Sequence, residues 1–218
     1  FVAIVGQNHD GHRFIGELYS IQNVRAFLVS NPEGVVEQFP DATFIVCGNT
    51  LDALQKLAAY HRSKYAYPVV GITGSNGKTI VKEWLNQLLS GNYRIVRSPK
   101  SFNSQVGVPL SVLQMDKNFQ LGIFEAGISL VGEMDKLQPI INPEIGIFTN
   151  IGLPHQENFA DIEQKVIEKL KLFKWVKQLI YCDDHPEVRN AIISNINKNT
   201  TQIFTWGHSA SVDVRIEK

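Results

Sequence analysis

Apolar residues follow two patterns along the chain, short uninterrupted runs and stripes at helical spacing. Short runs bounded by Gly, Pro or Asn predict buried strands, whereas stripes with a period near 3.6 residues predict amphipathic helices. After Pro68 the two patterns alternate, which predicts a mostly parallel sheet with helices on its faces. Strands are expected at 69–73, 93–97, 121–125, 145–150, 179–182 and 202–206, and helices at 79–89, 110–115, 130–141, 161–176 and from 184 onward. The helix at 79–89 is expected to bury Val81, Trp84, Leu85 and Leu88.

The first 62 residues carry the same pattern on a smaller scale. A strand is expected at 1–6, a helix at 12–23, strands at 26–30 and 43–47, and a helix from Asn49. A polar and aromatic stretch ended by Pro68 predicts a domain boundary. The fold class is therefore α/β, with a small N-terminal α/β domain at 1–65 and a mostly parallel-sheet domain at 66–218. Because both ends of the chain fall inside strand-like stretches, both domains are expected to be truncated.

Composition narrows the classes of partner. The chain is 44% hydrophobic and 19% charged, and Lys+Arg equals Asp+Glu at 21 each. This zero net charge argues against nucleic acid or an acidic membrane as a partner. The sequence has no apolar run long enough for a membrane-spanning helix and no signal peptide at its start. Cys47 and Cys182 lie inside apolar runs, which favours buried thiols in a reducing compartment, and we expect a cytoplasmic location.

A glycine-rich loop lies between the strand expected at 69–73 and the helix that follows it. Small residues at this point let consecutive backbone N–H groups face phosphate oxygens, and the helix N-terminus adds partial positive charge. Lys78 is placed to reach the β and γ phosphates, and the Thr79 hydroxyl to bind Mg²⁺. The loop predicts ATP binding, and hence a P-loop ATPase domain at 66–218. Its residues are Gly74, Ser75, Asn76, Gly77, Lys78 and Thr79.

The loop departs from the common G-x-x-x-x-G-K-[ST] pattern, because Ile72 stands where that pattern has its first glycine. The segment is therefore a G-x-x-G-K-T variant. An alternative interpretation, a glycine-rich turn with an incidental lysine, stays open on this segment alone.

Polar side chains fall where other expected strands end. Glu125 closes the strand 121–125, Asn103 follows the strand 93–97, and His155 follows the strand 145–150. In an open parallel sheet, ligands bind beyond the carboxyl ends of the strands. A carboxylate that ends an apolar strand is unfavourable unless it is paired or metal-bound, so Glu125 is favoured as a Mg²⁺ ligand over a solvated strand end. His155 alone is weak evidence for a site.

Lys169 falls inside the apolar stripe of the helix expected at 161–176. At about 100° per residue it projects between Phe173 and Val176, on the side that faces the core. A lysine in that position extends to solvent, pairs with a counter-charge, or loses its charge through a lowered pKa. Extension to solvent is the usual outcome, so the position alone leaves the role of Lys169 open.

Several motifs in the second domain occur together and in order. They are G-I-T-G-S-N-G-K-T at 71–79, Asn103 with Gly107 and Pro109, F-E-A-G at 124–127, T-N-I-G-L-P-H-Q-E-N-F at 149–159, and K-L-K-L-F at 169–173. The set resembles the Mur ligase family, the ATP-dependent enzymes that build the peptide of bacterial peptidoglycan. D-G-H-R-F at 10–14 is similar to a segment of the family member that adds D-Ala-D-Ala to UDP-MurNAc-tripeptide. The resemblance also implies that the family's third domain and the last part of its central domain are missing here.

The resemblance implies a role for each matching residue of the second domain. The loop 74–79 would bind the ATP phosphates, and Thr79 and Glu125 would hold one Mg²⁺. His155 and Lys169 would serve a second Mg²⁺, with Lys169 carbamylated. Lys78, His155 and Lys169 are therefore the implied catalytic residues.

The resemblance also implies where the substrates bind and what the reaction is. Asn103 is expected near the reacting carboxylate, and Asp10 and His12 in the domain that binds the UDP-sugar. ATP would phosphorylate the terminal carboxylate of UDP-MurNAc-tripeptide, and D-Ala-D-Ala would attack the acyl phosphate. A fusion to another cell-wall enzyme is compatible with the sequence. Alternatives are a sister Mur ligase or folylpolyglutamate synthase, a P-loop switch or motor ATPase, and a nucleotide-binding module without ligase activity.

Overall fold

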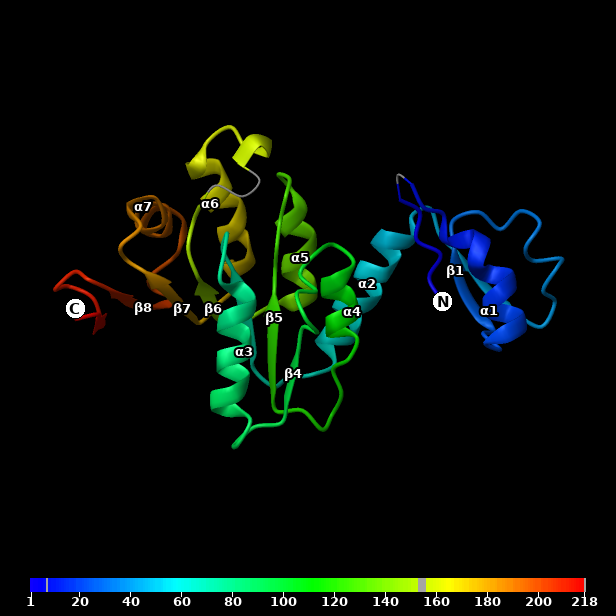
Figure 1. Cartoon of the computed structure of the whole chain (residues 1–218), viewed down its shortest axis with the longest axis horizontal. Helices are drawn as coiled ribbons and strands as arrows, with labels where there is room; N and C mark the ends of the chain where they lie inside the picture. Colours follow the sequence, from blue (N-terminus) through cyan, green and yellow to red (C-terminus); the bar gives the residue numbers. More distant parts are fainter. Residues whose placement is uncertain (7, 153–155, 218) are drawn as a thin grey trace. The chain divides into compact units, whose positions relative to one another are not determined.

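The computed structural model describes residues 1–6, 8–152 and 156–217, and the chain in it divides into two compact units, Phe1–Leu57 and Ala58–Lys218 (Figure 1). The division falls inside helix α2 (Thr50–Ser63) rather than at residue 65. The role predicted for the first unit, binding of the UDP-sugar, stays a prediction.

The first unit is a small parallel α/β layer. Strands β1 (Ala26–Val29) and β2 (Thr43–Val46) pair in parallel, and the 3₁₀ turn η1 (Gly11–Phe14) leads into α1 (Ile15–Ile21). Its core consists of Ala3, Ile15, Phe27 and Val29.

The strand predicted at 1–6 is wrong, because this segment forms only isolated bridges, Val2 with Leu28 and Val5 with Asp10. Phe1 and Ala3 exchange backbone hydrogen bonds with Leu28 of β1, whereas the residues that follow bond within a local loop. The amide of Gly6 donates to His9 O, and the amide of Gly11 donates to Ile4 O.

The second unit is built on a seven-stranded parallel sheet in the order β4-β5-β3-β6-β7-β8-β9. Its strands are β3 (Val69–Thr73), β4 (Ile95–Arg97), β5 (Leu121–Glu125), β6 (Ile145–Phe148), β7 (Gln178–Cys182), β8 (Gln202–Gly207) and β9 (Val214–Arg215). Its helices are α3 (Lys78–Leu89), α4 (Gly107–Val112), α5 (Glu133–Ile141), α6 (Ile162–Leu170) and α7 (Pro186–Asn195), with 3₁₀ turns η2 (Gln156–Asn158) and η3 (Lys171–Phe173). The parallel α/β fold predicted for this part of the chain is confirmed.

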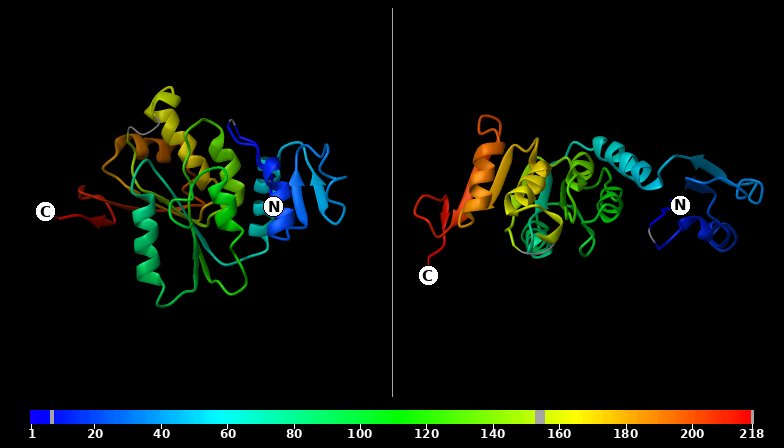
Figure 2. Two further views of the ribbon diagram at one scale, coloured as in Figure 1. Left: turned by 45° about the vertical axis from the view of Figure 1, so that its right-hand side comes forward. Right: turned by 90° about the horizontal axis from the view of Figure 1, so that it is seen from above.

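The two faces of this sheet carry different layers. On one face α3 packs through Val81, Leu85 and Leu89 against a cluster from β3 and β5. On the other face, α4, α5, α6 and α7 bury the larger core, and Figure 2 shows these helices from two further directions. Successive strand residues point to opposite faces, which is why Val69 and Ile72 belong to different clusters. Among the described residues, no helix is long and apolar enough to cross a bilayer.

The stripe predicted for α3 is partly wrong. Trp84 is 62% exposed and Leu88 is 76% exposed, whereas Val81 and Leu85 do pack on the sheet. A helix that meets a sheet along one narrow line buries positions four apart and leaves the flanks outside. Lys82, an unexpected member of the buried side, is fully buried.

Candidate active site

The glycine-rich loop lies between the carboxyl end of β3 and the first turn of α3. Gly74 has φ 143° and Gly77 has φ 79°, both in the range that side-chain-bearing residues rarely adopt. A Cβ on Gly74 would lie 2.0 Å from Thr149 Oγ1, so glycine is required there by space as well as by conformation. Gly77 is the N-cap of α3 and makes no side-chain cap bond, which leaves the first-turn amides suited to an anion.

Residues at the end of β6 hold this loop in place. The amides of Ser75 and Asn76 donate to Asn150 O and Oδ1, both at 2.9 Å, and Thr149 Oγ1 donates to Asn76 O at 2.6 Å. These two loop amides are therefore committed to the protein rather than to a ligand. Sequence reasoning placed Thr149 and Asn150 at a strand end without giving them this role. Their role depends on the position of β6 beside β3, and only the strand order of the folded sheet reveals that position.

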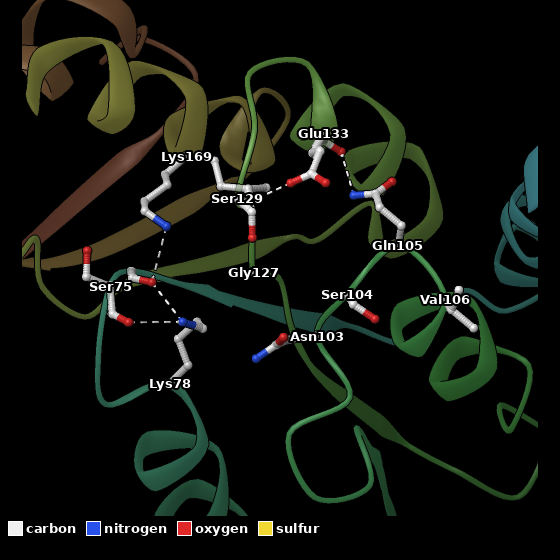
Figure 3. A pocket seen from close by; sticks show the side chains of 12 residues that line it. Ser75, Lys78, Asn103, Ser104, Gln105, Val106, Gly127, Ser129, Glu133 and Lys169 are labelled. Atoms are coloured by element: carbon white, nitrogen blue, oxygen red, sulfur yellow. Dashed lines mark hydrogen bonds between the residues drawn. The ribbon is translucent and has the colours of Figure 1, made fainter. Parts of the chain in front are cut away.

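Lys78 folds back over the loop. Its Nζ donates to Gly74 O at 2.9 Å and to Ser75 O at 3.3 Å, as the dashed lines in Figure 3 show. Burial lowers the pKa of Lys78, and the charge of Glu125 partly opposes that shift. The ammonium of Lys78 is thus held beside the loop by two carbonyl oxygens. Phosphate oxygens could take the place of these carbonyls as its hydrogen-bond acceptors.

Glu125, Thr79 and Asn103 meet beside the loop. Thr79 Oγ1 donates to Glu125 Oε2 at 2.9 Å, and Asn103 Nδ2 donates to the same oxygen at 3.4 Å. The amide of Gly127 donates to Asn103 O at 2.8 Å and fixes the segment that carries this side chain. A pocket of about 320 Å³ opens here, and it brings the loop, Asn103 and Lys169 together (Figure 3).

The Thr79–Glu125 pair has the chemistry that Mg²⁺ requires. Both groups offer hard oxygen atoms, and their 2.9 Å separation matches two adjacent ligands of an octahedral ion with bonds of about 2.1 Å. Across residues 1–6, 8–152 and 156–217, no cluster of three or more His, Cys, Asp or Glu side chains could hold a metal. A cation here would therefore rely on one carboxylate, one hydroxyl, water and phosphate, which is the usual pattern for Mg²⁺ with nucleotides.

Lys169 points into the same pocket and does not extend to solvent, the outcome that its place in the helical stripe left open. The residue is 3% exposed, and its Nζ donates to Gly74 O at 3.3 Å, the carbonyl that Lys78 also contacts. Burial, with the charges of Lys78 and Lys165, lowers the pKa of Lys169 to about 7. The neutral form of this amine is therefore accessible near neutral pH. His155, expected as the partner of Lys169, lies outside the described residues.

Asp10 and His12 belong to the first unit, where they form a local network. Asp10 Oδ1 accepts from His12 N at 2.9 Å and lies 2.6 Å from His12 Nδ1, and the backbone hydrogen bond is the main reason why the pKa of Asp10 is lowered. His12 Nε2 accepts from the amides of Ser30 and Asn31 at 3.1 and 3.2 Å. His12 therefore ties η1 to the end of β1, and a role for either residue with the UDP-sugar stays a prediction.

Comparisons with known proteins agree with this geometry. The Mur ligase middle domain matches residues 72–218. The UDP-N-acetylmuramoyl-tripeptide–D-alanyl-D-alanine ligase of Bacillus subtilis is 34% identical over 224 residues, covering 100% of this chain and 46% of the relative. The chain thus spans about half the length of the curated relatives it matches.

Solved structures give the same result. A crystal structure of MurF from Acinetobacter baumannii aligns with a TM-score of 0.82 at 27% identity, over 96% of this chain and 45% of that one. The MurF ligase of Thermotoga maritima in complex with ADP aligns with a TM-score of 0.81 at 27% identity, over 96% and 47%. On the match to the middle domain and on this fold, the chain belongs to the Mur ligase family.

Proposed function

We propose that this chain is the UDP-sugar-binding and nucleotide-binding part of an ATP-dependent ligase that joins D-Ala-D-Ala to UDP-MurNAc-tripeptide. The observation that carries the proposal is a pocket lined by the phosphate loop, Asn103 and Lys169. The Thr79–Glu125 pair lies next to it, because Asn103 Nδ2 donates to the Glu125 oxygen that Thr79 also contacts. Relatives that align over the whole chain are named for this reaction, which supports the choice of substrates.

The proposed reaction activates a carboxylate, a poor electrophile. The terminal carboxylate of the tripeptide attacks the γ-phosphorus of ATP, and the bond to the β-phosphate oxygen breaks, giving an acyl phosphate and ADP. The amine of D-Ala-D-Ala then attacks the acyl carbon, the new amide forms, and inorganic phosphate and a proton leave. Such phosphoryl transfer depends mainly on positioning and charge neutralisation.

The residues of the pocket would share these tasks. Lys78 and the uncapped first turn of α3 would hold the phosphates, and Asn103 would orient the attacking carboxylate. Thr79 and Glu125 would hold one Mg²⁺, and Lys169 with His155 would serve a second. When bound, Mg²⁺ would neutralise charge that develops on the phosphate oxygens.

We further propose that Lys169 is carbamylated. Its lowered pKa, about 7, supplies the neutral amine that this chemistry needs. The neutral amine nitrogen attacks the carbon of CO₂, an N–C bond forms while one C–O π bond opens to an oxygen anion, and the nitrogen loses a proton. The lysine then carries an oxygen-bearing anion in place of an amine that can be protonated. That change would remove the repulsion between Lys169 and Lys78 at Gly74 O.

Two alternatives are weaker. A sister ligase of the family would share the loop and the metal residues, but the relatives matched along the whole chain carry the D-Ala-D-Ala name. A nucleotide-binding module without ligase activity would not need Asn103 and Lys169 around the phosphate-loop pocket, with Asn103 donating to Glu125. The cytoplasmic location and a possible fusion to another cell-wall enzyme remain predictions from the sequence.

An amide-formation assay tests the proposal. The full-length protein that carries this chain is mixed with ATP, Mg²⁺, UDP-MurNAc-tripeptide and one amine from a panel of D-Ala-D-Ala, D-Glu, meso-diaminopimelate and L-Glu. We expect ADP release and amide product with D-Ala-D-Ala only. Product with another amine would move the protein to a sister activity, and ADP binding without product from any amine would support the module without ligase activity.

A further inference from the structure

Lys82 is a buried cation one turn after Lys78 on α3. Its side chain is 0% exposed, although the neighbouring positions that pack on the sheet are apolar. A buried ammonium is strongly unfavourable unless charges and hydrogen bonds compensate it. An apolar residue would satisfy packing at this position, so the contacts of the ammonium explain why a lysine is there.

Four oxygen atoms surround Lys82 Nζ. Two are backbone carbonyls of the segment after β4, since Nζ donates to Ser98 O at 2.8 Å and also to Lys100 O. Two are carboxylate oxygens, Glu125 Oε1 at 2.9 Å and Glu83 Oε1 at 3.1 Å. The ammonium thus joins the phosphate-loop helix, the end of β5 and the segment after β4.

The contact with Glu125 decides how that carboxylate is oriented. Oε1 faces Lys82, and Oε2 accepts the hydrogen bonds of Thr79 and Asn103. Among the described residues Oε1 has no well-directed hydrogen bond, so its partner is the charge of Lys82. Without that charge, Oε1 would be a buried anionic oxygen with no compensation, and the carboxylate would turn toward another donor.

The contact with the segment after β4 acts on Asn103. Lys100 has φ 47°, a left-handed conformation that is unusual for a lysine, and its carbonyl faces Lys82 Nζ. The amide of Phe102 then donates to Pro99 O at 3.0 Å and closes a turn immediately before Asn103. The ammonium therefore anchors the segment that places the Asn103 amide beside Glu125.

We propose that Lys82 is a positioning residue of the nucleotide and metal site. It works as a tethered cation that presents Glu125 Oε2 to Thr79 and anchors the segment carrying Asn103. The proposal rests on the proposed function, because it concerns the same Thr79–Glu125 pair. Lys82 itself is not among the residues that line the phosphate-loop pocket.

Calorimetry of ADP binding to this chain tests the proposal. The dissociation constant of ADP is measured in Mg²⁺ and in EDTA. The Mg²⁺ ratio is the constant in EDTA divided by the constant in Mg²⁺, and it gives the contribution of the metal to binding. We expect Lys82→Met to reduce this ratio by about 10- to 100-fold, the usual effect of losing a group that orients a metal ligand. The affinity in EDTA should change much less, because Lys78 and the α3 first turn are intact.

Arg62→Met is the matched control. Arg62 is also a buried cation that holds backbone carbonyls, with Nε donating to Ile141 O at 2.9 Å, but it lies outside the pocket. We expect this variant to lose thermal stability while its Mg²⁺ ratio stays that of the unmodified chain. If the Mg²⁺ ratio falls in both variants, the cause is a general loss of rigidity, and the positioning role of Lys82 is refuted.

The remaining outcomes are also distinct. Lys82→Gln, which keeps a polar end without the charge, serves as a second variant if Lys82→Met does not fold. Unfolding of both, or a Mg²⁺ ratio unchanged or raised in a folded variant, would overturn the proposal. If the unmodified chain shows no Mg²⁺-dependent ADP binding, the proposed function fails instead.

Discussion

At the scale of single residues, three lysines with lowered pKa values lie near the phosphate loop. Burial is the largest cause for Lys78, Lys165 and Lys169, and the first and last donate to the same carbonyl, Gly74 O. The chain has zero net charge, so this positive region is local and would attract a polyanion without making the whole surface basic. Its lysines give two predictions.

Lys78→Met should weaken ADP binding. Replacing a charged donor to phosphate removes about 1.5–3 kcal/mol, or roughly 10- to 100-fold in the dissociation constant. Calorimetry at fixed ionic strength measures the change, with the exposed Lys117→Met as control. Equal affinity for the two variants would contradict the phosphate-loop assignment.

Lys169→Met should stabilise the chain, and the gain should depend on pH. The pKa of Lys169 is about 7 in the folded chain, below its ordinary value of 10.5, so the unfolded chain binds more protons between these values. The unmodified chain therefore gains stability as pH rises from about 7 to about 10.5, and the advantage of the variant shrinks over that window.

Urea unfolding in CO₂-free buffer at several pH values between 6 and 10 measures this difference. Exclusion of CO₂ keeps the amine free during the experiment. A stability difference that does not change across the window would mean that Lys169 has an ordinary pKa.

At the scale of elements, the site is made where β3, β5 and β6 end side by side. The strand order β5-β3-β6 places Glu125 on one side of the loop and Thr149 with Asn150 on the other. The loop is thus held between two strand ends, and its glycines let it fit. Gly74 is the tightest point, because Thr149 fills the space where a side chain would lie.

Gly74→Ala should therefore distort the loop. The substitution combines a strained φ of 143° with a 2.0 Å clash, and such strain costs about 1–3 kcal/mol. We expect a lower thermal midpoint together with loss of ADP binding. Gly91→Ala is the control, since a Cβ there meets nothing within 4 Å. If both variants bind ADP like the unmodified chain, the loop does not depend on this contact.

At the scale of the whole molecule, the chain contains the pocket proposed for the nucleotide and spans about half the length of its curated relatives. A ligase of this kind needs a bound nucleotide, an acyl acceptor and an amine in one place. The proposed roles cover the phosphates and the acyl carboxylate, and none of the described residues has a proposed role with the amine or with adenine.

We expect the isolated 218-residue chain to bind Mg²⁺-ADP and to show ligase turnover at background level. Coupled ADP release and mass detection of the amide product measure turnover, and the full-length protein is the positive control. Normal turnover by the chain alone would mean that it already contains the amine site.

The sequence by itself determined the alternation of strands and helices, the phosphate loop and the inward direction of Lys169. These are local properties, because helical spacing, strand length and glycine position act over a few residues. The N-cap of α6 is also a local property, because the Asp161 side chain accepts from the amide of Gln164 three residues later.

Only the tertiary structure decided which strand ends are neighbours and which side chains share a pocket. The order β4-β5-β3-β6 is set by long-range packing, so the sequence did not reveal that Asn150 supports the loop or that Lys82 holds Glu125. The same packing left Trp84 exposed and buried Lys82, against the helical pattern. Burial of Lys82 is tolerated because distant segments supply oxygen partners for its ammonium. Hydrophobic periodicity identifies a buried face, whereas charge pairing across distant segments becomes visible only when the chain is folded.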